Sequence, residues 1–148
     1  MKLQENTRLA LYSMLEFAAD PGRQRSAAEI AGKYGASPHH LAKVLRRLGR
    51  AGLLRAARGA GGGYRFAANA KRTTLMDVIA LFEAVGEPRA ARRLRPEEKA
   101  LEAVLAEIDQ TAAATFGSIT LATMLKLAGR LAQPPRSARD RAGGSRAG

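Results

Sequence analysis

LLRAARGAGGGYRF, residues 53–66, sets two short apolar or aromatic runs on either side of a glycine-rich turn. This arrangement predicts a β-hairpin, because glycine adopts the positive φ angles of tight turns and lets the backbone approach a partner closely. Arg55, Arg58 and Arg65 place positive charge on the same hairpin. We therefore expect a wing that can approach a flat, negatively charged partner.

The segment just before the hairpin, residues 37–50, predicts a basic helix. Ser37 can cap it and Pro38 suits its first position. Its apolar residues have the i, i+3, i+4, i+7 spacing of a buried stripe, namely Leu41, Val44, Leu45 and Leu48. The remaining surface is basic and comprises His39, His40, Lys43, Arg46, Arg47 and Arg50. A basic helix followed by a glycine–arginine hairpin is the order of elements in a winged helix-turn-helix.

The other elements of residues 1–85 agree with that order. Apolar spacing predicts a first helix over residues 5–19, ended by Asp20-Pro21-Gly22. Ser26 and Glu29 have the spacing of a capping box, so a second helix should start there and run to Tyr34, with Gly35 closing it. A further helix should start at residues 74–77 and continue through Phe82. The predicted fold class is mainly α with a small β-hairpin wing, and residues 1–85 form the DNA-binding domain.

The C-terminal part divides into three predicted segments. Residues 86–95 form a connecting loop, residues 96–132 form dimerisation helices, and residues 133–148 form a disordered basic tail rich in Pro, Gly, Ser and Arg. The first dimerisation helix covers residues 96–116, with carboxylates in its first turn, and a short apolar helix over residues 119–125 follows Gly117-Ser118. The apolar stripe of the helix over residues 96–116 comprises Leu101, Val104, Leu105, Ile108 and Ala112. We interpret this stripe as the seam with a second chain; the alternative is that the helix folds back on its own domain.

The composition favours a polyanionic partner. The chain has 148 residues, a formal net charge of +12 and a pI of about 11.2, which is typical of proteins that bind nucleic acid. Residues 1–85 carry 14 Lys and Arg against 6 Asp and Glu. A generally basic composition explains part of this excess, but its concentration in the helix and hairpin points to double-stranded DNA.

Several classes of site are excluded or disfavoured. The chain has no cysteine, which excludes disulfides, thiolate zinc sites and cysteine-ligated clusters. His39 and His40 point about 100° apart on a helix and have no carboxylate within four residues, so we predict no metal site and no cofactor. No nucleophile–base pair stands out, and the glycine run lacks phosphate-loop spacing, so we predict no enzyme activity. No membrane span or secretory signal is evident, and a cytoplasmic location is expected.

The ordered motifs resemble the IscR/NsrR/CymR (Rrf2) family of bacterial winged-helix regulators. The resemblance runs from Met1 to about Leu127. It rests on residues 28–31 (AEIA), residues 48–54 (LGRAGLL), residues 58–64 (RGAGGGY) and residues 74–79 (TLMDVI). The family implies a homodimer on a palindromic promoter site, with the third helix in the major groove and the wing at the minor groove. The DNA-binding positions are then Ser37, Pro38, His39, His40, Lys43, Arg46 and Arg47 on the helix, and Arg58, Gly59, Gly61, Gly62, Gly63 and Tyr64 on the wing.

The chain departs from the cluster-binding members of that family. Those members carry three cysteines in the interval that corresponds to residues 86–95, and some offer a carboxylate near the N-terminus where this chain has Arg8. Cluster sensing is therefore not carried over, and control by a regulatory protein partner is an open alternative. We predict a dimeric, sequence-specific transcriptional repressor. The alternatives are a winged-helix protein-interaction module and a non-specific nucleic-acid binder.

Overall fold

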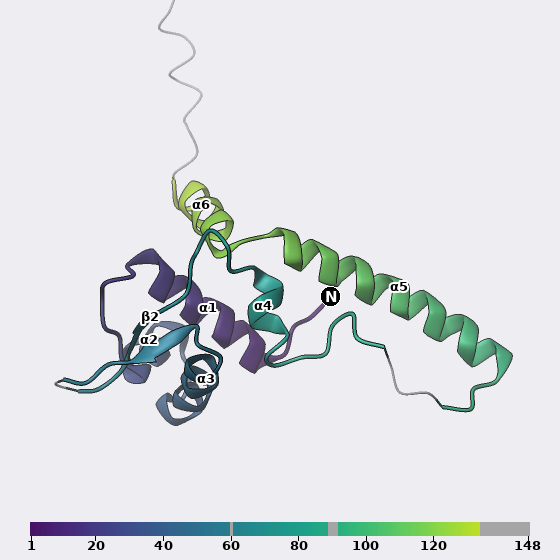
Figure 1. The fold of residues 1–148 in the computed structure, drawn as a ribbon, viewed down its shortest axis with the longest axis horizontal. Coiled ribbons are helices and arrows are strands. Elements are labelled where there is room, and N and C mark those ends of the chain that lie inside the picture. The colour runs from purple at the N-terminus through teal and green to yellow at the C-terminus, as the bar shows by residue number, and fades with distance from the viewer. Residues whose placement is uncertain (60, 89–91, 134–148) are drawn as a thin grey trace, which may run out of the picture.

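Helix α1 (Glu5–Ala19) runs through the middle of the structure, and α2, α3, α4, α6 and the hairpin contact it (Figure 1). The computed structural model describes residues 1–59, 61–88 and 92–133. Phe17 and Met14 of α1 are fully buried, and they pack within one apolar cluster that includes residues from all these helices. The predicted first helix is confirmed at both of its ends.

Helices α2 (Ala27–Tyr34) and α3 (Pro38–Arg50) form the helix-turn-helix. The Ser26 and Ser37 hydroxyls accept hydrogen bonds from the backbone N–H groups of Glu29 and His40, as the predicted N-caps require. Gly35 has a φ of 65° at the end of α2, a left-handed conformation that favours glycine.

The predicted capping box at α2 is only half formed. Ser26 caps the helix, but the Glu29 carboxylate pairs with Arg23 at 2.6 Å and Arg25 at 3.4 Å. Two guanidinium groups thus take the carboxylate that the sequence pattern assigns to the helix cap.

The wing consists of the antiparallel strands β1 (Leu54–Ala56) and β2 (Tyr64–Phe66), with Leu54 opposite Phe66. Arg25, in the loop between α1 and α2, forms an isolated bridge to Tyr64 through two backbone hydrogen bonds of 3.0 Å. The hairpin is therefore tied to the segment that enters α2.

Helix α4 (Leu75–Ile79) is shorter than expected. The Thr74 hydroxyl and the Asp77 carboxylate form the capping box at its start. Beyond Ile79, the Leu81 and Phe82 N–H groups each bond to the carbonyl three residues earlier, so the chain leaves the α-helix as a tight turn. The prediction that the helix continues through Phe82 is wrong, although Phe82 still packs against the core.

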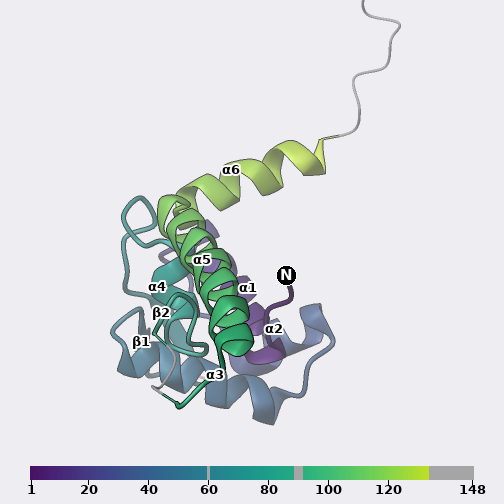
Figure 2. The same ribbon diagram turned by 90° about the vertical axis from the view of Figure 1, so that its right-hand side faces the viewer.

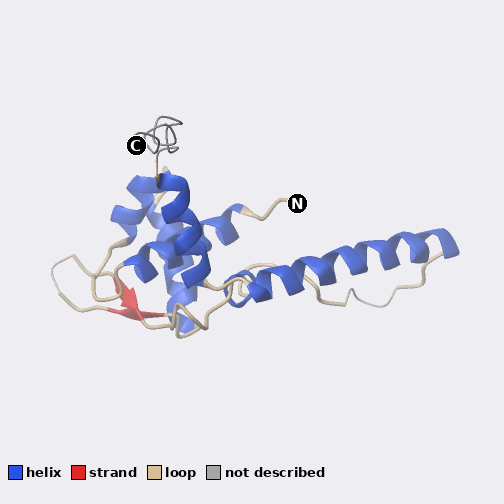
Figure 3. Cartoon of the chain, turned by 90° about the horizontal axis from the view of Figure 1, so that it is seen from above, coloured by secondary structure: helices blue, strands red, loops and turns tan. Residues whose placement is uncertain are grey.

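Helix α5 (Pro96–Ser118) projects from the body of the molecule (Figure 3), and α6 (Leu121–Ala132) turns sharply away from it (Figure 2). The sequence predicts a break at Gly117-Ser118, but α5 includes both residues. The break comes at residues 119–120, where the Leu75 N–H donates to the Ile119 carbonyl at 2.8 Å. The last helix also extends beyond the predicted residue 125. Of the predicted tail, only Gln133 is described; residues 134–148 lie outside the described residues.

Candidate nucleic-acid interface

The outer face of α3 is the first component of the candidate interface. Leu41, Leu45 and Leu48 are fully buried and fix the rotation of the helix about its axis. That rotation leaves the basic and N-terminal positions exposed to solvent, namely Ser37, Pro38, His39, Lys43, Arg46, Arg47 and Arg50. The geometry thus presents most of the predicted helix contacts on one accessible surface.

The two adjacent histidines differ in exposure. His39 is exposed, whereas His40 is half-buried and its Nε2 atom is buried without a hydrogen-bond partner among the described residues. The two side chains leave the helix in different directions, as predicted from the helical repeat. His39 is therefore free to meet a partner, and His40 is constrained by the protein around it.

Arg47 makes an intramolecular contact that sequence reasoning missed. Its guanidinium carbon lies 5.1 Å from the centroid of the Phe82 ring, within the range of a cation–π interaction. Phe82 lies 35 residues further along the chain, so helical spacing alone gives no sign of this contact. Arg47 remains exposed, but part of its side chain serves to join α3 to the turn after α4.

The wing brings like charges together. Arg55 and Arg65 are directly opposite one another on the two strands, and both are exposed. Like charges in that position repel each other and weaken a hairpin. A polyanion lying against the wing would relieve that repulsion. Arg58 is also exposed, at the start of the glycine loop.

Glycine is required at position 63 because the backbone there passes close to the backbone of Arg25. Its φ is 127°, and a Cβ atom there would lie 2.4 Å from the Arg25 carbonyl oxygen. Gly59, Gly61 and Gly62 also have positive φ values. The Tyr64 ring instead packs on α3: a Cβ at Gly49 would lie 3.1 Å from its Cε1 atom. The structure thus places the Tyr64 ring against α3 rather than at the tip of the wing.

The segment before α2 contributes a residue that the sequence did not single out. The Gln24 side-chain amide donates a 2.7 Å hydrogen bond to the Gly62 carbonyl in the wing. The two residues are 38 positions apart, and no local pattern marks such a contact. Gln24 becomes recognisable only when the fold brings the two loops together.

The α3–wing surface carries positive charge that the protein does not neutralise. Between Glu29 and Asp77 the sequence contains no acidic residue. The basic residues of this interval from α3 onward are Lys43, Arg46, Arg47, Arg50, Arg55, Arg58, Arg65, Lys71 and Arg72. None of them forms an ion pair with a carboxylate of the described residues. Such a surface attracts a polyanion at long range.

The α1–α2 surface has basic residues that are paired. Lys33 contacts the Glu16 carboxylate, and the Tyr34 hydroxyl donates a 2.6 Å hydrogen bond to the same group. Burial raises the pKa of Glu16, but the hydrogen bonds from Lys33 and Tyr34 outweigh it and hold that pKa below its ordinary value. Burial and the bond to Glu16 raise the pKa of Tyr34. The charge on this face is therefore largely satisfied within the protein.

The outer part of α5 exposes an apolar stripe. Leu101, Val104 and Ile108 are 59%, 54% and 57% exposed. Further along the helix Ala112 and Phe116 pack against the core of the same chain, so folding back accounts for that part of the predicted stripe. Leu105 lies between these extremes and is half-buried. Three large apolar side chains remain without a partner in the described part of the protomer.

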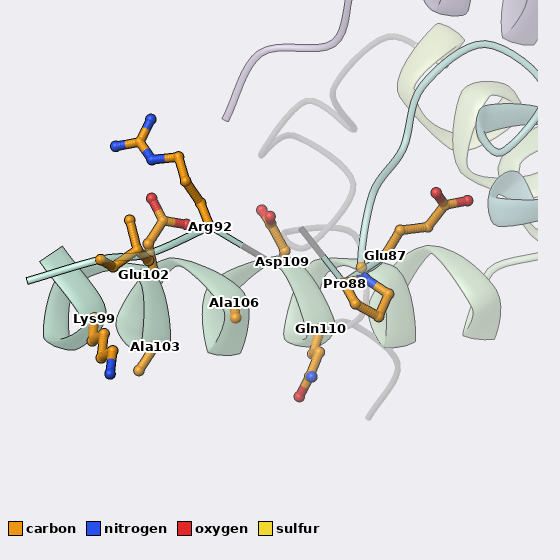
Figure 4. Close-up of a pocket in the computed structure, with 11 residues that line it drawn as sticks. Glu87, Pro88, Arg92, Lys99, Glu102, Ala103, Ala106, Asp109 and Gln110 are labelled. Carbon is orange, nitrogen blue, oxygen red and sulfur yellow. The ribbon is translucent and has the colours of Figure 1, made fainter. Parts of the chain in front are cut away.

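A cavity of about 620 Å³ lies between α5 and residues 86–88, 92 and 94 of the predicted connecting loop. Figure 4 shows Glu102 and Asp109 on one side of α5 and Lys99 and Gln110 on another. Neither histidine nor cysteine lines this cavity, and the described residues contain no group of three or more His, Cys, Asp or Glu arranged to hold a metal. The residues present do not fit a cysteine-ligated iron–sulfur cluster.

Comparison with known proteins identifies the family. Residues 3–127 match the model of the Rrf2 family, described as iron-dependent transcriptional regulators. The chain belongs to the Rrf2 family. It is 51% identical over 129 residues to BadM of Rhodopseudomonas palustris, which is named as an HTH-type transcriptional regulator; the match covers 86% of this chain and 83% of BadM.

Solved Rrf2-type structures have the same architecture. CymR of B. subtilis, the global cysteine regulator, superposes with a TM-score of 0.71 at 26% identity, covering 86% of this chain and 98% of CymR. IscR of T. potens gives a TM-score of 0.75 at 25% identity, covering 90% and 93% of the two chains. The predicted family and winged-helix fold are confirmed. The chain is a transcriptional regulator and not an enzyme. None of its described helices is long and apolar enough to cross a membrane.

Proposed function

We propose that this Rrf2 protein is a homodimeric, sequence-specific repressor that binds a palindromic promoter site. The observation that carries the proposal is the unneutralised basic surface formed by α3 and the wing. By contrast, Arg23, Arg25 and Lys33 on the α1–α2 surface each pair with a carboxylate. DNA phosphates would neutralise the unpaired basic side chains of α3 and the wing.

Each part of the surface has a role in the proposed complex. Ser37, Pro38 and His39 lie at the N-terminal end of α3, the end that reaches base edges when a recognition helix enters the major groove. Lys43 and Arg46 lie one and two turns further on and contact phosphates. Arg58 enters the adjacent minor groove, where a narrow A/T-rich groove concentrates negative potential.

The exposed stripe of α5 supports the dimer. Leu101, Val104 and Ile108 are each more than half exposed, and packing against the same helix of a second chain would bury them. Two protomers related by a two-fold axis present two α3 helices to two half-sites. Residues 96–132 would then serve dimerisation, and residues 1–85 would serve DNA binding.

We propose further that the protein acts without a cysteine-ligated cluster. The chain has no thiol to supply the ligands. Anaerobically purified protein should contain neither iron nor acid-labile sulfide in stoichiometric amounts, as colorimetric assays would show. Stoichiometric iron and sulfide would contradict this proposal. Control of DNA binding would fall to a regulatory protein partner or to another ligand.

A salt titration tests the central proposal. A duplex is first enriched from a random library by the wild-type protein, and its affinity is compared with that of a shuffled duplex from 50 to 300 mM salt. A specific regulator should prefer the enriched duplex by about 10³ or more. Equal affinity for both duplexes would indicate a non-specific binder, and no binding to either would favour a protein-interaction module. Transcription from a promoter that carries the enriched site should fall when the protein is added.

A further inference from the structure

Gln24 lies where it can fix the shape of the wing. Its amide nitrogen donates to the Gly62 carbonyl at 2.7 Å, and its Oε1 atom lies 3.8 Å from where a Cβ of Gly59 would stand. The side chain is half-buried. The amide therefore hydrogen-bonds the loop at Gly62 and lies beside Gly59.

The loop has little else to hold it. Within it, the Gly62 N–H donates to the Gly59 carbonyl at 3.1 Å, and the Ala57 N–H donates to the Gly63 carbonyl at 2.9 Å. The Arg25–Tyr64 bridge fastens β2 at its loop end, and residues 59, 61 and 62 lie beyond that bridge. Glycines lose more conformational freedom on ordering than any other residue. Among the described residues, Gln24 is the side chain from the body of the domain that hydrogen-bonds this loop.

Arg58 stands directly before the loop. It is exposed, and no described carboxylate pairs with it. Its position relative to the domain depends on how the backbone of residues 57–59 and 61–63 is held. An arginine adds to DNA affinity when it is held close to the floor of a narrow minor groove. A mobile wing would let Arg58 adopt many positions, and fixing one of them on binding would reduce the affinity.

We propose that Gln24 is a positioning residue that holds the wing so that Arg58 can discriminate between DNA flanks. The inference rests on the proposed function, since it needs the wing to contact DNA. Gln24 itself need not touch DNA. Its hydrogen bond to Gly62 restricts the glycine loop before binding and so lowers the ordering cost at the moment of contact.

The test is a double-mutant cycle. Wild type, Gln24→Ala, Arg58→Ala and the double variant are titrated against the enriched duplex with A/T-rich or G/C-rich flanks. Gln24→Ala should weaken binding to A/T-rich flanks about threefold to tenfold, and it should have almost no further effect once Arg58 is absent. Gln4→Ala, an exposed glutamine at the start of α1, is the matched control and should bind as wild type does.

Each outcome of the cycle has a definite meaning. Equal fold losses for Gln24→Ala with and without Arg58 would overturn the positioning role. If Arg58→Ala leaves binding to both flanks unchanged, the proposed wing contact fails instead, independently of Gln24. Gln24→Asn keeps the amide but shortens the side chain by one methylene; it should behave like Gln24→Ala if reach to Gly62 is what matters.

A measurement on the free protein separates the two proposals. Backbone ¹⁵N relaxation should show lower order parameters at Gly61, Gly62 and Gly63 in Gln24→Ala, with α3 unchanged. Unchanged order in the glycine loop would overturn the inference even if the wing binds DNA. This readout also shows directly whether each variant is folded.

Discussion

The α3–wing face and the α1–α2 face of the winged domain both carry basic side chains, but only one of them keeps its charge available. On the α1–α2 face, Glu16 meets Lys33 and Arg25, and Glu29 meets Arg23 and Arg25. On the α3–wing face no described carboxylate meets any of the arginines or lysines. Net charge therefore overestimates how many basic side chains are free to contact DNA. The positions of the carboxylates show which basic surface remains unpaired.

The largest expected effect comes from separating the two protomers of the proposed dimer, because each would contribute only one α3–wing face. Ile108→Glu places a charge in the exposed stripe of α5, where burial against a second chain would be costly. We expect a monomer in sedimentation, and operator affinity should fall about 100-fold or more because the two half-sites are no longer bound together.

A matched variant controls for charge on α5. Ala103→Glu adds the same carboxylate about 140° around the helix from Ile108, on an exposed position, and should remain dimeric. If Ile108→Glu sediments as a dimer like wild type, the stripe of Leu101, Val104 and Ile108 is not the seam.

The next effect separates His39 from His40 on the α3–wing face. His39→Ala should cost roughly 1–3 kcal/mol at the enriched duplex and less on shuffled DNA, because an exposed side chain near the start of a recognition helix reaches base edges. His40→Ala should change thermal stability more than affinity, since its ring is half-buried. A His40→Ala variant with unchanged melting temperature and the larger loss of operator affinity would reverse these assignments.

A smaller effect compares one lysine from each face. Lys43→Gln should reduce the slope of log affinity against log salt by about one unit, because the variant would neutralise one phosphate fewer. Lys33→Gln should leave the slope almost unchanged, because Glu16 already neutralises Lys33. Equal reductions from the two variants would show that paired and unpaired charges serve DNA alike, and the comparison of the two faces would fail.

The smallest effect on DNA binding is expected at Glu16, where the consequence is for stability. Its pKa is lowered in the folded protein, so its stabilising contribution is complete above the ordinary value near 4.5 and is lost as the pH falls through the folded value. Glu16→Gln should lower stability by about 1–2 kcal/mol at pH 7, with unchanged operator affinity. Melting curves of both proteins from pH 7 to pH 3 should converge at the acid end; a constant difference would contradict the prediction.

Local signals predicted most element boundaries correctly, because they act over three or four residues. Ser26, Ser37 and Gly35 define the ends of α2 and α3 through hydroxyl caps and a left-handed glycine. One error arose where a distant group changed the local outcome. Ile119 accepts a hydrogen bond from the Leu75 N–H and Leu121 donates one to the Thr73 carbonyl, and α5 ends at these contacts rather than at Gly117.

Helical periodicity, glycine conformation and residue chemistry are local properties, so the amino-acid order was enough to predict the winged helix-turn-helix, its basic helix and the absence of thiol ligands. The packing of the chain was needed to establish which charges remain unpaired, which part of the α5 stripe is covered and which side chain hydrogen-bonds the wing. Glu16 with Lys33, Arg47 with Phe82, and Gln24 with Gly62 are separated by 17, 35 and 38 positions. Contacts at such separations depend on how the helices pack around α1, and no pattern within a single element encodes them.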